Sequence, residues 1–151
     1  TAARYQKEGL PADKTMGMNI GGSVKLDGIT VTMTDAYHSS ETGEPAGYIV
    51  TLEDGKRVYH AGDTGIHCNM ATWAELYPLD VALLPIGSVY TMDPVQAAHA
   101  LKLLKPKVAL PQHYGTFPIL VQSADEFVRL AGEKAPGTKV VVLEPGGTYE
   151  F

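Results

Sequence analysis

The sequence is poor in cysteine, in long hydrophobic runs and in clustered basic residues. Its single cysteine, Cys68, excludes an internal disulfide bond, so we expect a reducing compartment such as the cytoplasm. No apolar run approaches the roughly 20 residues that a membrane-spanning helix needs, so no membrane association is expected. The formal charge is −5, which argues against a nucleic-acid backbone as partner, because phosphate binding requires clustered Lys and Arg.

The first half of the chain predicts two β-hairpins. Asp-Gly pairs at 27–28 and 54–55 favour tight two-residue turns. The strands expected around these turns are residues 23–26, 29–35, 47–52 and 56–60. In the second of them, Ile29, Val31 and Met33 alternate with threonines, which predicts one buried, aliphatic face.

The second half predicts strands that alternate with helices. Asp93-Pro94 offers a capping residue followed by a proline at the first helical position, and Pro106 ends that helix. The remaining expected elements are strands at 81–86 and 108–111, helices at 69–76 and 123–133, and a closing hairpin at 139–143 and 148–151. This order predicts an α/β (α+β) fold in one compact unit, with a sheet layered against helices.

Three segments place a residue that can bind metal just past the end of an expected strand. These residues are His38, Asp63 and His113. Loops at one end of a rigid sheet commonly hold catalytic groups, and two imidazoles with a carboxylate suit Zn²⁺, Mn²⁺ or Fe²⁺. Taken singly, each has a structural alternative: a surface or core histidine for His38, a turn residue for Asp63 and a hydrogen-bonded histidine for His113. Their spacing matches no local zinc motif.

The sequence around each of these residues resembles a motif of the metallo-β-lactamase superfamily. YHAGDTG at 59–65 is similar to its metal-bridging aspartate motif. AYHSS at 36–40 resembles its third histidine element, and PQHYGTF at 111–117 resembles its last. VALLPIG at 81–87 and TMDP at 91–94 are similar to a narrower branch, the metal-dependent hydrolases related to the ascorbate-6-phosphate lactonases. In order and spacing the motifs cover nearly all of the chain after its first fifteen residues.

The resemblance implies a fold and a set of roles. The fold would be half of an αββα sandwich, a mixed sheet with helices on its outer face. His38 would bind the first of two divalent metals, Asp63 would bridge both, and His113 would bind the second, with Asp63 and His113 as catalytic residues. The metals would be Zn²⁺ or Mn²⁺, with Fe²⁺ or Ni²⁺ as further candidates. A metal-activated water would attack an ester, lactone, amide or phosphoester.

The superfamily's His-x-His-x-Asp-His element does not occur in the chain. The five histidines are His38, His60, His67, His99 and His113, and they form no such cluster. We therefore expect residues 1–151 to be the C-terminal portion of a single domain. The complementary N-terminal fragment, from the same gene, would carry the element, either as a chain separated by proteolysis or as a segment outside this sequence. If the fragment is missing, one face of the sheet should expose aliphatic side chains that the fragment would otherwise cover.

Smaller expectations concern five other residues. Tyr90, Tyr114 and Thr116 lie just past expected strand ends, and we expect them to contact a small-molecule substrate, with loop packing as the alternative. His60 is expected to orient a metal ligand, with packing inside the strand as the alternative. His67, beside the cysteine, is interpreted as structural.

The sequence thus predicts a metal-dependent hydrolase of a small molecule that is active with its complementary half. One alternative is a phosphodiesterase or nuclease of the same superfamily, which would need a basic groove. The other is a non-catalytic binding domain that has lost its metals. Self-association into a homo-oligomer stays open.

Overall fold

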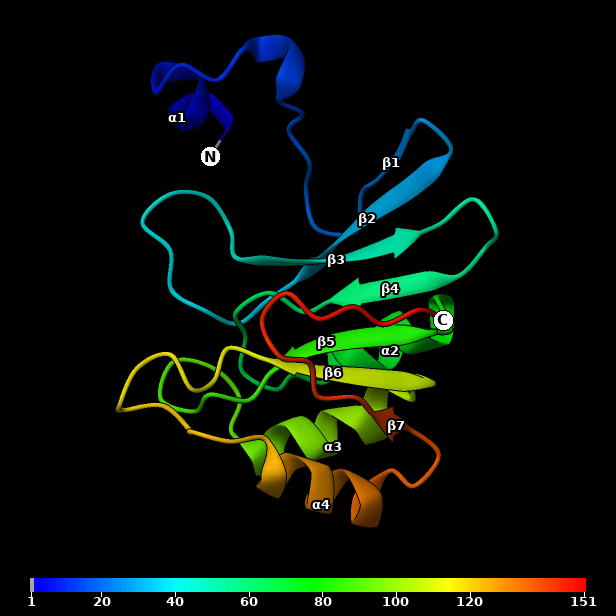
Figure 1. The fold of residues 1–151 in the computed structure, drawn as a ribbon. Coiled ribbons are helices and arrows are strands. Elements are labelled where there is room, and N and C mark those ends of the chain that lie inside the picture. Colours follow the sequence, from blue (N-terminus) through cyan, green and yellow to red (C-terminus); the bar gives the residue numbers. More distant parts are fainter. Residues whose placement is uncertain (1) are drawn as a thin grey trace.

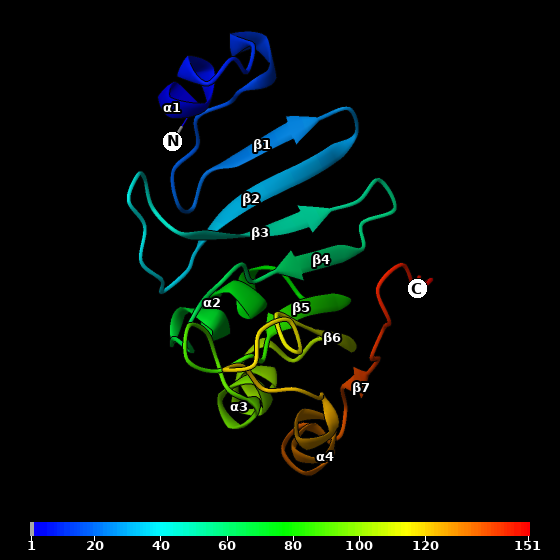
Figure 2. The ribbon, with the colours of Figure 1, turned by 60° about the vertical axis from the view of Figure 1, so that its left-hand side comes forward.

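Residues 2–151 are described in a computed structural model of the chain, and Thr1 lies outside the described residues. They form one mixed sheet in the strand order β1-β2-β3-β4-β5-β6-β7, with three helices on one face (Figures 1 and 2). The strands are β1 (Ser23–Leu26), β2 (Ile29–Asp35), β3 (Ala46–Thr51), β4 (Arg57–His60), β5 (Val81–Pro85), β6 (Val108–Gln112) and β7 (Lys139–Val140).

The helices that cover the sheet are α2 (Asn69–Leu76), α3 (Pro94–Leu104) and α4 (Asp125–Lys134). The short helix α1 (Ala2–Lys7) and the 3-10 turn η1 (Ala12–Lys14) lie beyond the β1 edge of the sheet (Figure 1). Among the residues that the structure describes, no helix combines the length and apolar character needed to cross a membrane.

The direction of the strands changes at β4. Strands β1 to β4 pair antiparallel, as the two hairpin signals predict, and β4 to β7 pair parallel. The turn between β1 and β2 has positive φ at both Asp27 (43°) and Gly28 (92°), the conformation that an Asp-Gly hairpin turn favours. Apart from the strands expected for the closing hairpin, the expected strands and helices are therefore present, with ends shifted by at most two residues.

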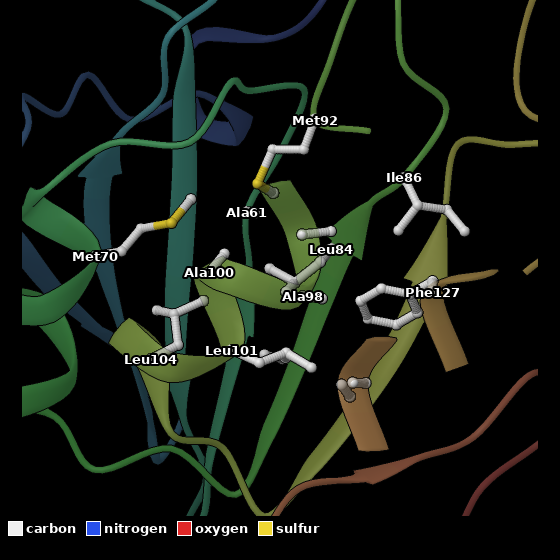
Figure 3. Packing of buried hydrophobic residues seen from close by; sticks show 14 of the residues in the cluster. Ala61, Met70, Leu84, Ile86, Met92, Ala98, Ala100, Leu101, Leu104 and Phe127 are labelled. Carbon is white, nitrogen blue, oxygen red and sulfur yellow. The ribbon is translucent and has the colours of Figure 1, made fainter. Parts of the chain in front are cut away.

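The core lies between the helices and the sheet. Met70 of α2, Leu101 of α3 and Phe127 of α4 are fully buried and belong to one hydrophobic cluster with Leu84 of β5 (Figure 3). Helix α3 contributes most, because six of its eleven residues are buried. The sheet and its helices therefore form a rigid body from which the loops extend.

The face of β2 that points toward the helices carries its threonines. Thr32 pairs with Ile49, and Ile49 pairs with Tyr59; all three are buried on the helix side. The aliphatic residues of β2 therefore point to the opposite side of the sheet, where Met33 is buried and Val31 is only half-buried. The expectation of one buried, aliphatic face is therefore met only in part.

A row of valines crosses this opposite face, one from each of six neighbouring strands. The row consists of Val24, Val31, Val50, Val58, Val81 and Val108. The last two are buried, whereas the four on β1 to β4 are only half-buried. We call this set the valine row. It is an aliphatic surface that the helices of this chain do not cover.

The expected closing hairpin does not form. Only Lys139 and Val140 add to the sheet, as the parallel strand β7, and the remaining residues run without strand structure on the side away from the helices (Figures 1 and 2). The end of this segment contacts the β3–β4 turn, where the Lys56 ammonium donates a 2.7 Å hydrogen bond to the Phe151 carbonyl. Pro145 and two glycines offer turn chemistry, but no second strand pairs with β7.

The start of α3 provides a test of the fold. The Asp93 carboxylate accepts a 2.7 Å hydrogen bond from the Gln96 amide, directly before Pro94 at the first helical position. Replacing Asp93 by alanine should lower the free energy of unfolding by about 1 kcal/mol, because an N-terminal amide loses its partner. Asp93→Asn keeps an accepting oxygen and should be close to wild type. Urea denaturation measures both; equal stability of the two variants would contradict this role of Asp93.

Candidate metal centre

The three candidate ligands follow strands that end at the same edge of the sheet. Strands β2 and β4 run in one direction because each pairs antiparallel with β3, and β5 and β6 share that direction through parallel pairing. The loops after β2, β4 and β6 carry His38, Asp63 and His113, and the loop after β5 lies between the last two (Figure 1). The topology therefore gathers residues that are 75 positions apart in sequence at most.

His38 lies three residues beyond β2 and is exposed. Its Nδ1 lies 2.8 Å from the Ser39 carbonyl oxygen, to which a protonated Nδ1 donates. That tautomer leaves the Nε2 lone pair for a metal, and a carbonyl behind the ring is a common partner of a metal-binding histidine. Residues 38–40 line a shallow hollow of about 270 Å³ together with Pro45, Ala46 and Asp63.

Asp63 lies three residues beyond β4, with its side chain half-exposed. Gly62 before it has a φ of +67°, and a Cβ there would lie 2.5 Å from the Ala46 carbonyl oxygen. Only glycine allows the chain to turn so closely past β3. Asp63 lines the same hollow as His38.

His113 directly follows β6 and has a φ of +58°, a strained value for a non-glycine residue. Its Nε2 lies 3.6 Å from Asp63 Oδ2. Its Nδ1 is buried and has no hydrogen-bond partner among the described residues. It lies close to Gly87, where an added Cβ would lie 2.9 Å from that nitrogen and would collide with the His113 carbonyl oxygen. The close approach of the loop after β5 thus holds the imidazole against Asp63.

The three side chains adjoin one another without converging on one point. Asp63 shares a hollow with His38 and lies beside His113. Over residues 2–151, no three His, Cys, Asp or Glu side chains are close enough together to hold an ion unaided. The donor set fits a divalent cation in type, since it offers two imidazoles and one half-exposed carboxylate. It fits a site to which other ligands would have to contribute.

The three residues expected to contact substrate, Tyr90, Tyr114 and Thr116, differ in how far they are exposed. Tyr90 is more than half-exposed and Thr116 is exposed, and neither lines the hollow. Tyr114 is half-buried and packs against the core. Burial, with lesser contributions from Glu144 and Asp125, raises the pKa of its phenol, so it stays a protonated donor at neutral pH. Their contact with a substrate stays a prediction.

His60 supports the Asp63 loop through the main chain. Its Nδ1 accepts a 3.1 Å hydrogen bond from the Gly62 amide, one residue before the aspartate. The ring is exposed and lies in register with Tyr48 on the face that carries the valine row. This geometry supports the expectation that His60 orients a ligand, although it acts on the backbone rather than on a ligand side chain.

Sequence reasoning missed the residues that hold the loops together. The Thr64 hydroxyl accepts from the Tyr37 amide at 2.9 Å, and the Gly65 amide donates to the Tyr37 carbonyl at 3.0 Å. The Met92 amide donates to the Thr64 carbonyl at 3.0 Å, which ties in the loop after β5. All these residues lie inside the motifs at 36–40, 59–65 and 91–94, and this was the one sequence signal that could have pointed to them. That they tie the loops together is visible only from their hydrogen-bond partners in the structure.

Comparison with known proteins identifies the family. Residues 1–114, which include all three candidate ligands, match the family described as the beta-lactamase superfamily domain. The chain belongs to this family. A metal-dependent hydrolase from Nitratidesulfovibrio vulgaris is 50% identical over 149 residues, which cover 97% of this chain and 62% of that protein. A metal-dependent hydrolase from Lawsonia intracellularis is 43% identical over 154 residues, covering 100% of this chain and 67% of that protein.

The fold agrees with a solved structure of the family. Igni18, a metallo hydrolase from the archaeon Ignicoccus hospitalis, superimposes with a TM-score of 0.88 at 45% identity, covering 99% of this chain and 65% of that one. The expected α/β fold, with its mixed sheet and helices on one face, is therefore confirmed. The narrower resemblance to ascorbate-6-phosphate lactonases stays a prediction.

The relatives are longer than this chain, which spans 62% of the length of the first of them. In each relative the matched region lies in one polypeptide, so these comparisons do not support a separate partner chain. Whether residues 1–151 correspond to the C-terminal portion of the domain stays a prediction.

Gly87 provides a test of how His113 is held. Gly87→Ala should lower the free energy of unfolding by roughly 1–3 kcal/mol and displace the imidazole, because its Cβ would overlap the His113 main chain. Gly132→Ala in α4 is the matched control: nothing lies within 4 Å of its added Cβ, so it should be neutral or stabilising. Urea denaturation and the NMR signals of the His113 ring measure the two effects. An unshifted His113 ring in Gly87→Ala would contradict the close approach.

Proposed function

We propose that this chain provides three of the protein ligands of a dinuclear metal-dependent hydrolase: His38, Asp63 and His113. The observation that carries the proposal is the position of Asp63, which lines the same hollow as His38 and whose Oδ2 lies 3.6 Å from His113 Nε2. A carboxylate with an imidazole on either side suits a bridging position between two divalent ions. The names of the relatives, which are metal-dependent hydrolases, support the same reading.

The chain's own residues would orient the ions and the substrate. His38 would bind through Nε2 while Ser39 fixes its tautomer, and His113 would bind through Nε2 while Gly87 fixes its ring. Bound Zn²⁺ or Mn²⁺ would lower the pKa of a coordinated water and polarise the bond to be cleaved. The Asp63 side chain is half-exposed, so a substrate could reach the proposed metal site from solvent.

The substrate we propose is an ester, lactone or phosphoester of a small molecule. The net charge of −5 weighs against a long polyanion, because binding a nucleic-acid backbone requires many Lys and Arg contacts. The hollow of about 270 Å³ beside His38 and Asp63 is near the small end of ligand sites. Tyr90 and Thr116, both exposed past strand ends at the same edge, would contact the substrate.

Activity would also require a complementary segment of the same polypeptide, which supplies the remaining ligands. The valine row supports this, because β2 turns its threonines to the helices and its aliphatic residues to the side that this chain leaves partly uncovered. Fully burying one valine contributes roughly 1.5–3 kcal/mol relative to exposure, so covering this face would stabilise the fold considerably. A second layer packed there would complete a two-sheet sandwich.

Substitution of the bridging residue tests the metal centre. In the complete gene product, Asp63→Asn and His113→Ala should each reduce the bound zinc or manganese and lower hydrolysis of a panel of lactones, esters and phosphodiesters at least 100-fold, because a ligand to the reacting ions is lost. His99→Ala is the control, since His99 is exposed on α3. Metal analysis and steady-state rates measure the effects. Full activity of Asp63→Asn would refute the proposal.

The uncovered face can be tested separately. Residues 1–151 expressed alone should enhance the fluorescence of anilinonaphthalene sulfonate, a dye that binds exposed apolar surface, whereas the complete gene product should do so much less. Val50→Lys in the isolated chain should weaken the dye signal, because Val50 lies in the middle of the half-buried part of the valine row. Equal dye binding by the isolated chain and the complete gene product would contradict the proposed covering layer.

A further inference from the structure

His67 is a buried histidine that belongs neither to the candidate ligands nor to the residues that contact them. It precedes α2, and only 6% of its surface is exposed. Neither ring nitrogen has a hydrogen-bond partner among the described residues, and Nδ1 lies 3.6 Å from Asp35 Oδ2. Burying an imidazole without full partners is unfavourable, so its presence at this position calls for a physical reason.

The Asp35 carboxylate beside His67 is itself tightly held. It accepts a 2.6 Å hydrogen bond from Trp73 Nε1 and a 2.7 Å hydrogen bond from Asn69 Nδ2, both from α2. Asp35 is the last residue of β2, so these bonds fasten α2 to the end of the strand that leads to His38. His67, at the start of the same helix, is thereby placed against the residues that follow β2.

The His67 ring stacks on the ring of Tyr37. The two centroids are 4.9 Å apart and the ring planes differ by 23°. Tyr37 immediately precedes His38. Tyr37 is 59% exposed, and His67 covers one face of the Tyr37 ring. The stack therefore restrains the side chain of Tyr37, the neighbour of the proposed ligand His38. His67 does this without contacting His38 itself.

The backbone of Tyr37 is at the same time fastened to the loop of Asp63. Its amide donates to Thr64 Oγ1, and its carbonyl accepts from the Gly65 amide. Thr64 is completely buried and immediately follows Asp63. The two hydrogen bonds hold only the main chain of Tyr37, which can still rotate about the line that joins them. The stacked His67 ring holds the Tyr37 side chain and so opposes that rotation. The His67 stack and the two hydrogen bonds therefore act together on the residue that precedes His38.

From this arrangement we infer that His67 is a positioning residue, whose stack on Tyr37 sets the separation of His38 and Asp63 and so raises the affinity of the site for its metal. The inference rests on the proposed function, because it concerns the same site. His67 acts through Tyr37 and touches no ligand, so the flat ring, rather than a nitrogen, is the part that matters. This also accounts for ring nitrogens left without partners.

Zinc affinity in a set of variants of the complete gene product tests the inference. His67→Ala should weaken zinc binding about 10- to 100-fold in isothermal titration, as expected when a group that orients a ligand is removed. His67→Phe keeps a flat ring and should bind within about threefold of wild type. Tyr37→Leu removes the other ring from an exposed position, so the fold should persist while zinc binding weakens as in His67→Ala. His99→Ala is the control.

Hydrogen exchange provides a readout that needs no metal. In the metal-free protein, the amides of Tyr37 and Gly65 bridge the two loops, and His67→Ala and Tyr37→Leu should each increase their exchange rates at least 10-fold. Amides within α3 should not change in Tyr37→Leu, which separates loop loosening from general destabilisation. His67→Phe should retain the protection of both loop amides.

The outcomes separate the two proposals. If wild-type protein binds zinc and both His67→Ala and Tyr37→Leu bind it equally well, the positioning role is refuted and the proposed function stands. If His67→Phe binds zinc as weakly as His67→Ala, the positioning role is also refuted, because a flat ring at this position would not be sufficient. If wild-type protein binds no zinc, manganese, iron or nickel, both proposals are refuted, whatever the exchange rates show.

Discussion

The parallel register of β4, β5 and β6 is the constraint on which the rest of the structure depends. Tyr59, Ala82 and Ala109 lie opposite one another in this register, and each is fully buried against the helices. A slip of one residue would turn every side chain to the other face, so burial fixes the register strongly. The strand ends are fixed with it, which sets the positions of Asp63 and His113.

The candidate site is a set of loops held by main-chain contacts across this frame. The loop after β5 lies between the loops of Asp63 and His113, and its amides and carbonyls bond to both. Gly87 permits an approach to His113 that no side chain would tolerate, and His113 keeps a left-handed backbone. Strain of this kind is maintained only where the surroundings determine the conformation, and it gathers at functional sites.

The two faces of the sheet differ in a way that favours the proposed second layer. The helix-facing side carries Ile49 and Tyr59 and, on β2, threonines, while the other side carries the valine row. An aliphatic row that the chain's own helices leave partly uncovered is suited to a second layer. The same layer would be in a position to bring ligands to the edge where His38 and Asp63 lie, so completion of the fold and of the site would be one event.

The sequence by itself determined most of the elements and singled out the candidate ligands. Asp-Gly turns, the Asp93-Pro94 helix start and the buried run of β5 are local signals, and each formed as predicted because its cause lies within a few residues. Only the tertiary structure decided the rest. Which face of β2 meets the helices, the failure of β7 to gain a hairpin partner and the stack of His67 on Tyr37 depend on partners far along the chain. Alternation of residue types shows that a strand has two faces, and the neighbouring layers decide which of them is buried.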